Sequence, residues 1–348
     1  MMDWRVLSEI AVLRTIAAFY AIGLLILASA YAYPTRIVDA NSLTERGNSP
    51  IYIPILLSLL CLIPIHLWQK GYRQKNKLST DINAKDKSRM LFWIFTLFTL
   101  ALSVRIPSVL LFAEPYEKTP LISLLVTTII LIEKTEPSAF GFRTQGVGKS
   151  LVHGLAFFTV LGGVTFLTYD LLVYAFTNQT VFQSYDFLPF LFAMPFMTFC
   201  VGIGEEGLFR GYMQTHLEKF YSSKQAILAQ AILFGGWHFV WNLSPFNAWA
   251  MAEYVAQTFV SGLLFGYFYS KTRNLVPLIF AHGLWNSVQM GIITNATTIT
   301  ALQNAPLLGQ ILTWILPFAV SAAATLFLVK YYAKKYHMKD PAEKSRGR

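Results

Sequence analysis

Residues 187–211 read FLPFLFAMPFMTFCVGIGEEGLFRG, an uncharged apolar run that ends directly in the two carboxylates Glu205 and Glu206. A helix crosses the bilayer core with about 20 mostly apolar residues, so this run predicts a membrane span. No Pro interrupts residues 196–219. The helix is therefore expected to continue past Gly211 and to hold both carboxylates below the membrane surface. An ionisable residue at such a depth is costly and indicates a functional site.

The rest of the chain has the same apolar character. Of its 348 residues, 55% are hydrophobic and only 13% are charged, whereas charged residues make up about a quarter of an average soluble domain. This composition excludes a disordered chain and, despite the net charge of +10, a nucleic-acid-binding module. Cys61 and Cys200 both lie in apolar runs, which excludes a disulfide scaffold and a four-Cys zinc site.

Apolar runs recur along the chain and predict an all-α polytopic membrane protein with about ten transmembrane helices. The predicted spans are residues 15–33, 51–68, 90–113, 121–132, 151–176, 187–203, 225–243, 254–270, 275–293 and 308–330. The segment 121–132 is shorter than a span requires, so it is expected to be tilted, re-entrant or extended into its flanks.

The distribution of basic residues gives an orientation for these spans. With both termini in the cytoplasm and ten crossings, the inner side collects all but four of the 28 Lys and Arg; the exceptions are Arg36, Arg46, Arg105 and Lys118. The predicted outer loops 177–186, 244–252 and 294–307 contain no Lys or Arg. We interpret the basic loop 70–89 and the basic tail as topology determinants and contacts to anionic lipids. The small loops favour a bacterial inner (plasma) membrane.

The segment after the sixth predicted span contains a potential ion pair. Glu206 and Arg210 are four residues apart, so they lie on one helix face and are expected to pair. Glu205 lies about 100° further round the helix and is free to point elsewhere. By itself this pattern is equally typical of a salt-bridged helix end at the water boundary.

Two later spans each add a polar group at helical spacing. Phe234 and His238 are one turn apart in the seventh span, and His282 and Asn286 are one turn apart in the ninth. The chain otherwise avoids polar groups in its apolar runs. Three such pairs on three helices therefore indicate one shared site rather than independent packing residues.

The residue types at this site favour hydrolytic chemistry. No Ser lies in an elbow motif and neither Cys has a nearby His partner, which argues against a covalent nucleophile. The remaining mechanism is a carboxylate that activates water as a general base, helped by a His and by hydrogen-bond donors to the oxyanion. A distributed zinc site of two His and one carboxylate, formed by His238, His282 and Glu205, is the alternative that the residues leave open.

The three motifs resemble those of a known family. Glu-Glu-x-x-x-Arg at residues 205–210, Phe-x-x-x-His at 234–238 and His-x-x-x-Asn at 282–286 occur in this order on successive predicted helices. In this they resemble the CPBP family, the CAAX proteases and bacteriocin-processing enzymes, which includes the type II CAAX prenyl endopeptidases. The resemblance implies an intramembrane protease with a catalytic cavity inside the helix bundle.

The resemblance also implies roles for the matched residues. Glu205 would activate water with the help of His238, and His282 and Asn286 would stabilise the oxyanion. The supporting residues would be Glu206, Arg210 and Phe234. The family resemblance implies no obligatory metal; zinc or another divalent ion held by His238, His282 and Glu205 stays the alternative.

The same resemblance divides the chain and suggests its substrates. We expect an N-terminal transmembrane region over residues 1–150 without an assigned motif, a CPBP-like catalytic transmembrane core over 151–338 and a polar cytoplasmic tail over 339–348. The substrate would be a membrane-associated or prenylated peptide or protein, and no nucleic acid is expected as a partner.

Two other functions are alternatives to proteolysis. A proton-coupled transporter also uses buried carboxylates and His residues, but such folds are commonly built from internal repeats and this sequence has none that we detect. A non-catalytic peptide-binding immunity protein would not need the complete set of Glu205, His238, His282 and Asn286. Arg105 and Asp170 lie in predicted spans outside the motifs, and we expect them to pair with each other or to lie at a membrane boundary.

Overall fold

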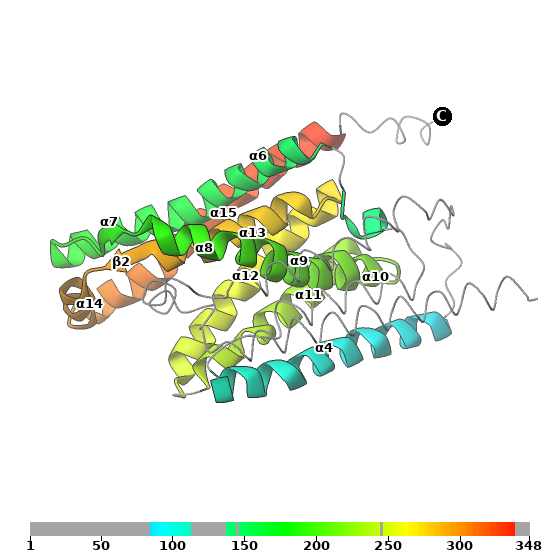
Figure 1. Ribbon diagram of the computed structural model, residues 1–348, viewed down its shortest axis with the longest axis horizontal. Helices are drawn as coiled ribbons and strands as arrows, with labels where there is room; N and C mark the ends of the chain where they lie inside the picture. The colour runs from blue at the N-terminus through cyan, green and yellow to red at the C-terminus, as the bar shows by residue number, and fades with distance from the viewer. Residues whose placement is uncertain (1–83, 113–136, 144–145, 244–245, 338–348) are drawn as a thin grey trace, which may run out of the picture.

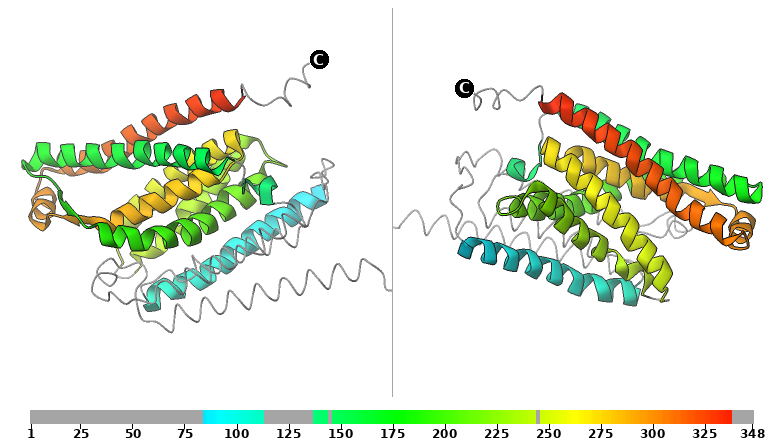
Figure 2. Two further views of the ribbon diagram at one scale, coloured as in Figure 1. Left: turned by 45° about the horizontal axis from the view of Figure 1, so that its top comes forward. Right: turned by 180° about the vertical axis from the view of Figure 1, so that it is seen from behind.

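The computed structural model describes residues 84–112, 137–143, 146–243 and 246–337. The predicted spans at 15–33, 51–68 and 121–132 lie outside the described residues, as does the tail 339–348. The described part is mostly helical, as predicted. In Figures 1 and 2, α15 lies with α6 and α7 on one side of the bundle and α4 lies on the opposite side.

The helical segments follow one another with short connections. The α-helices are α4 (Ala84–Phe112), α6 (Val147–Phe158), α7 (Val164–Thr177), α8 (Phe187–Phe196), α9 (Ile203–Glu206), α10 (Thr215–Leu217), α11 (Ser223–Trp237), α12 (Ala248–Thr272), α13 (Val276–Gly291), α14 (Ala296–Gln303) and α15 (Leu307–His337). The π-helical segments are η3 (Thr159–Gly163), η4 (Met197–Gly202) and η5 (Gly207–Gln214), and the 3-10 segments are η2 (Pro137–Phe140) and η6 (Phe239–Asn242).

Two helical stretches in the described residues have the length and apolar composition to cross a membrane. They are Val147–Thr177, which combines α6, η3 and α7, and Leu307–Tyr332 within α15. These two stretches pack side by side, since α7 contacts α15 along its length. Helix α13 has 16 residues, which makes it about 24 Å long, less than the thickness of the hydrocarbon core. The count of about ten spans stays a prediction.

The helix that begins with the opening apolar run continues as expected. From Phe187 to Leu217 the chain is helical throughout, through α8, η4, α9, η5 and α10. The π-helical segments η4 and η5 lie on either side of α9. Helices with π-type turns are frequent at functional sites, and here they enclose the short segment that carries Glu205 and Glu206.

The structure differs from the sequence predictions in two details. Within the seventh predicted span, 225–243, α11 ends at Trp237, and the 3-10 segment η6 follows after the turn at His238. The all-α description also misses a small antiparallel sheet of β1 (Phe182–Tyr185) and β2 (Ile292–Thr294). Strands of three and four residues are too short to produce a detectable alternation in sequence.

Close packing at glycines brings α13 against the helix that carries the carboxylates. A Cβ atom at Gly283 would lie 2.6 Å from the Thr198 Cα atom in η4, and one at Gly202 would lie 2.7 Å from the Ile279 carbonyl oxygen in α13. Real Cβ atoms do not approach other atoms so closely, so both positions require glycine. This contact determines how far His282 lies from Glu205 and Glu206.

We therefore predict that Gly283→Ala destabilises the protein. The added methyl group must push α13 away from η4, an overpacking change that typically costs about 1–3 kcal/mol. Gly236→Ala is the matched control, because no described atom lies within 4 Å of a Cβ atom built there. Thermal unfolding of the purified proteins in detergent measures the difference. Equal melting temperatures for the two variants would contradict the packing argument.

Candidate active site

Glu205 and Glu206 both have fully buried side chains, although they are neighbours in sequence. Because successive helical residues are about 100° apart, the two carboxylates point to different partners. Glu206 faces Arg210 and His282, whereas Glu205 faces Trp237, His238 and His282. Helices α9, α11 and α13 lie next to one another in the middle of the bundle (Figure 1).

The predicted pair of Glu206 and Arg210 is confirmed. Arg210 Nη1 donates to Glu206 Oε1 at 3.1 Å, and both side chains are inaccessible to solvent. The Arg210 guanidinium carbon also lies 4.0 Å from the centre of the Phe234 ring and 5.2 Å from that of Phe265. The aromatic faces and the carboxylate together compensate a cation that would be expensive to bury alone.

Glu206 also contacts His282, and this contact fixes the orientation of the His282 ring. His282 Nδ1 lies 2.8 Å from Glu206 Oε1. Since an ionised carboxylate only accepts hydrogen bonds, Nδ1 of His282 carries the proton and donates. The other ring nitrogen, Nε2, then faces Glu205 Oε2 at 3.6 Å.

His238 is oriented in the same way by a backbone carbonyl. Its Nδ1 lies 2.8 Å from the Phe234 carbonyl oxygen, an acceptor, so Nδ1 carries the proton and donates. Its Nε2 faces Glu205 Oε2 at 3.9 Å. Both His side chains therefore direct Nε2 at the same carboxylate oxygen. The early end of α11 makes this possible, because His238 is the C-cap residue of that helix rather than part of its interior.

The sequence analysis missed Trp237 and the use of Arg105. Trp237 Nε1 donates to Glu205 Oε1 at 3.3 Å, which leaves Oε2 towards the two His residues. Arg105 Nε in turn donates to the Trp237 carbonyl oxygen at 3.1 Å, with its guanidinium carbon 4.6 Å from the centre of the Trp237 ring. The position of Trp237 directly before His238 and the charge of Arg105 within a predicted span were the available signals.

Of the two alternatives expected for Arg105 and Asp170, pairing with each other is not what the structure shows. Asp170 Oδ1 instead accepts from the Val181 amide at 2.7 Å, in the connection between α7 and β1. Arg105 lies on α4, on the opposite side of the bundle from α7 (Figure 2). The sequence showed two isolated opposite charges in apolar runs, but it contained no information on how far apart their helices lie.

Phe234, His238, His282 and Asn286 line one cavity of about 160 Å³, which we call the motif cavity. Helical segments far apart in sequence complete its wall, among them α6 and α12. Within the described part of the chain, the Asn286 side chain has no hydrogen-bond partner. Its amide is therefore available to a molecule bound in the cavity. Glu205 does not line the cavity. Its Oε2 atom faces the Nε2 atoms of His238 and His282, which do line it.

The alternative zinc site would use His238, His282 and Glu205, and the distances between their ligand atoms can be compared with those of a zinc site. Zinc holds nitrogen and oxygen ligands at about 2.0–2.2 Å, which places neighbouring ligand atoms of a tetrahedral site about 3.3–3.6 Å apart. The Nε2 atoms of His238 and His282 lie 3.9 and 3.6 Å from Glu205 Oε2. Among the described residues, no group of three or more His, Cys, Asp or Glu has a geometry that fits a metal ion.

We predict that Arg210→Ala is strongly destabilising, because it leaves the buried Glu206 carboxylate without its cation. Breaking a buried pair in this way typically costs about 3–5 kcal/mol. Arg143→Ala is the control at an exposed Arg, where substitutions usually change stability by no more than about 0.5 kcal/mol. Detergent-solubilised yield and melting temperature report the effect. An Arg210→Ala protein as stable as Arg143→Ala would show that the buried pair has no structural role.

A comparison with protein families identifies the region that contains these motifs. Residues 187–288 match the family model described as type II CAAX prenyl endopeptidase Rce1-like. The match runs from the start of α8 into α13 and includes every motif residue from Glu205 to Asn286. Comparison with curated proteins gives no significant match. Over residues 187–288, this match supports the similarity to the CPBP family of CAAX-type intramembrane proteases that the three motifs indicate.

Proposed function

We propose that the protein is an intramembrane endopeptidase that hydrolyses a peptide bond with a water molecule activated by Glu205. The observation that supports this most directly is the convergence of His238 Nε2 and His282 Nε2 on Glu205 Oε2, in a buried site next to the motif cavity. A carboxylate that acts as a general base must be held in a fixed orientation, with a group that accepts or donates a proton within reach of it. Here Glu205 Oε2 faces the Nε2 atoms of both His238 and His282.

In this proposal, each surrounding group has a distinct task. Trp237 holds Oε1 of Glu205, so that Oε2 is the oxygen that accepts the proton of water. His238 receives or returns a proton at Nε2, because its Nδ1 proton is held by the Phe234 carbonyl. Asn286, one turn after His282 on α13, donates its amide N–H to the oxyanion of the tetrahedral intermediate, and His282 donates at Nε2 once that nitrogen has taken up a proton, since its Nδ1 proton is held by Glu206. Glu206 and Arg210 fix the His282 ring and make no contact with the substrate.

The proposed substrate is a membrane-associated or prenylated peptide or protein. The name of the matched family supports this class. The wall of the motif cavity supports it as well, because Phe157, Phe158, Leu161 and Phe265 surround the polar motif residues with apolar surface. We further propose a multi-pass protein of a bacterial inner membrane with both termini in the cytoplasm, in contact with anionic lipids, as the distribution of Lys and Arg indicates.

Glu205→Gln should reduce peptide hydrolysis by at least about 100-fold, because the amide preserves the shape of the side chain but does not accept the proton of water. Asp186→Asn is a matched control, since it also converts a carboxylate to an amide. Asn caps a helix as well as Asp does, so the α8 N-cap is retained. Proteomic comparison of cells that express each variant, together with cleavage of a prenylated peptide, measures the effect. Undiminished turnover by Glu205→Gln would refute the role of this residue as the base.

We also propose that hydrolysis needs no metal ion. Exhaustive treatment with a divalent-metal chelator should therefore leave the cleavage rate unchanged. Asp186→Asn, which keeps the proposed catalytic residues, should respond to the chelator as the unmodified protein does. Loss of activity on chelation, with recovery on addition of zinc, would instead favour a site of His238, His282 and Glu205. Measuring zinc content and activity in the same preparations distinguishes the two mechanisms.

A further inference from the structure

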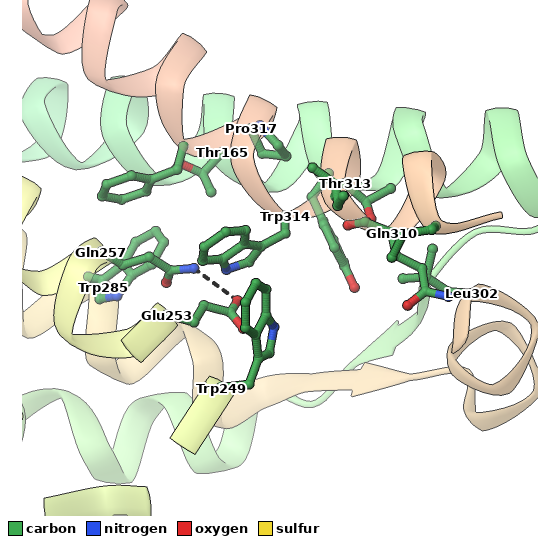
Figure 3. Close-up of a pocket in the computed structure, with 14 residues that line it drawn as sticks. Thr165, Trp249, Glu253, Gln257, Trp285, Leu302, Gln310, Thr313, Trp314 and Pro317 are labelled. Carbon is green, nitrogen blue, oxygen red and sulfur yellow. Dashed lines mark hydrogen bonds between the residues drawn. The ribbon is translucent and has the colours of Figure 1, made fainter. Parts of the chain in front are cut away.

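A second, larger cavity lies next to the motif cavity. It has a volume of about 410 Å³ and is formed by residues of α7, α12, α13, α14 and α15 (Figure 3). The two cavities share Gln257, Trp285 and Phe318 in their walls. A molecule bound in the second cavity therefore lies within one side-chain layer of the motif residues.

Aromatic rings and one carboxylate give this cavity its chemical character, and we call it the aromatic pocket. The rings belong to Tyr169, Trp249, Trp285, Trp314 and Phe318, and the carboxylate to Glu253. The ring centres of Trp249 and Trp314 are 5.4 Å apart with an interplanar angle of 46°, so they form a corner beside the Glu253 side chain (Figure 3). Trp249 is 67% exposed, which makes the pocket accessible from outside the bundle.

Glu253 has no cationic partner in the described part of the chain. The groups in contact with its carboxylate are neutral: Gln257 Nε2 donates to Glu253 Oε1 at 3.2 Å, and the Trp314 indole lies beside it. Among the described residues that line the pocket, none is Lys, Arg or His. A partly buried carboxylate without a cation pays a desolvation cost that a bound positive charge would offset.

The arrangement of the rings adds to the case for a cation. Trp residues are common where a membrane meets water, and this preference accounts for an exposed Trp249. It does not account for a carboxylate that lines the same pocket as three Trp rings. The faces of Trp and Tyr rings attract cations, and quaternary ammonium groups in particular are bound by aromatic cages. A carboxylate beside such rings supplies the full charge that the rings lack.

We propose that the aromatic pocket binds an organic ammonium group next to the motif cavity, with Glu253 as its counter-ion and Trp249 and Trp314 as its aromatic walls. That this group belongs to the substrate of the protease rests on the proposed function. The binding itself does not, because no part of the pocket's charge or aromatic surface depends on Glu205.

Direct binding to the purified full-length protein, in a non-ionic detergent, tests the proposal. The probes are choline and its uncharged carbon isostere 3,3-dimethylbutan-1-ol, with dissociation constants measured by calorimetry or ligand-detected NMR. Choline should bind about 10-fold or more tightly than the isostere, because only the cation gains from the ring faces and the carboxylate. Equal affinity for the two probes would overturn the proposal.

Three variants locate the binding. Glu253→Gln should remove most of the preference for choline, while Asp186→Asn, which removes a carboxylate outside the pocket, should retain it. Trp249→Leu should also weaken choline binding, and because this side chain is largely exposed, its replacement leaves the fold intact. Choline binding that is the same in Glu253→Gln and in the unmodified protein would overturn the assignment of Glu253.

A third probe distinguishes the two sources of an ammonium group. n-Butylammonium represents a lysine side chain or a peptide amine, and choline represents a lipid headgroup. Tighter binding of n-butylammonium would assign the pocket to a peptide amine, and tighter binding of choline to a headgroup; either result supports an ammonium site. Failure of all cation binding would leave the Glu205 chemistry untouched, so the two proposals are separately testable.

Discussion

The contacts of the buried Glu206 carboxylate hold the candidate site together. One oxygen of this side chain binds Arg210 Nη1 at 3.1 Å within its own helix and His282 Nδ1 at 2.8 Å on α13. A charged network of this kind is stable away from water only when its members are paired and hydrogen-bonded. The close packing of Gly202 and Gly283 between the same two elements keeps His282 within reach. The orientation of His282 towards Glu205 follows from these contacts.

The early end of α11 has an equally direct consequence for the site. Because regular helical structure stops at Trp237, His238 turns its ring back to the Phe234 carbonyl and directs its other nitrogen at Glu205. Trp237, still in the helix, reaches the other oxygen of the same carboxylate. Two neighbouring residues at a helix end thus hold the two oxygens of Glu205 in different surroundings.

The two cavities relate the proposed chemistry to substrate choice. The motif cavity combines polar motif residues with apolar walls, and the aromatic pocket adds a carboxylate and Trp rings on the other side of Gln257, Trp285 and Phe318. In the proposed mechanism, hydrolysis of a peptide bond uses the residues of the motif cavity. The proposed ammonium site in the aromatic pocket would add contacts that select among membrane-associated substrates, within one side-chain layer of the motif residues.

The sequence by itself determined the features that depend on helical period. The apolar runs predicted the helices, and four-residue spacing predicted the pairing of Glu206 with Arg210 and the common face of His282 and Asn286, because i and i+4 residues lie one turn apart in any helix. Motif order was sufficient to indicate the family. The sequence did not reveal that α11 ends at Trp237, since residues 225–243 contain no Pro and no Asp, Glu, Lys or Arg that would mark a helix end.

Only the tertiary structure decided which side chains meet across helices. His282 and Glu206 are 76 residues apart and Arg105 and the Trp237 carbonyl 132 residues apart, so no local pattern connects them. The same holds for the aromatic pocket, whose Glu253, Trp285 and Trp314 lie on three helices. Such contacts depend on how closely two helices approach and how each is rotated, and these quantities follow from packing of the whole bundle rather than from any single segment.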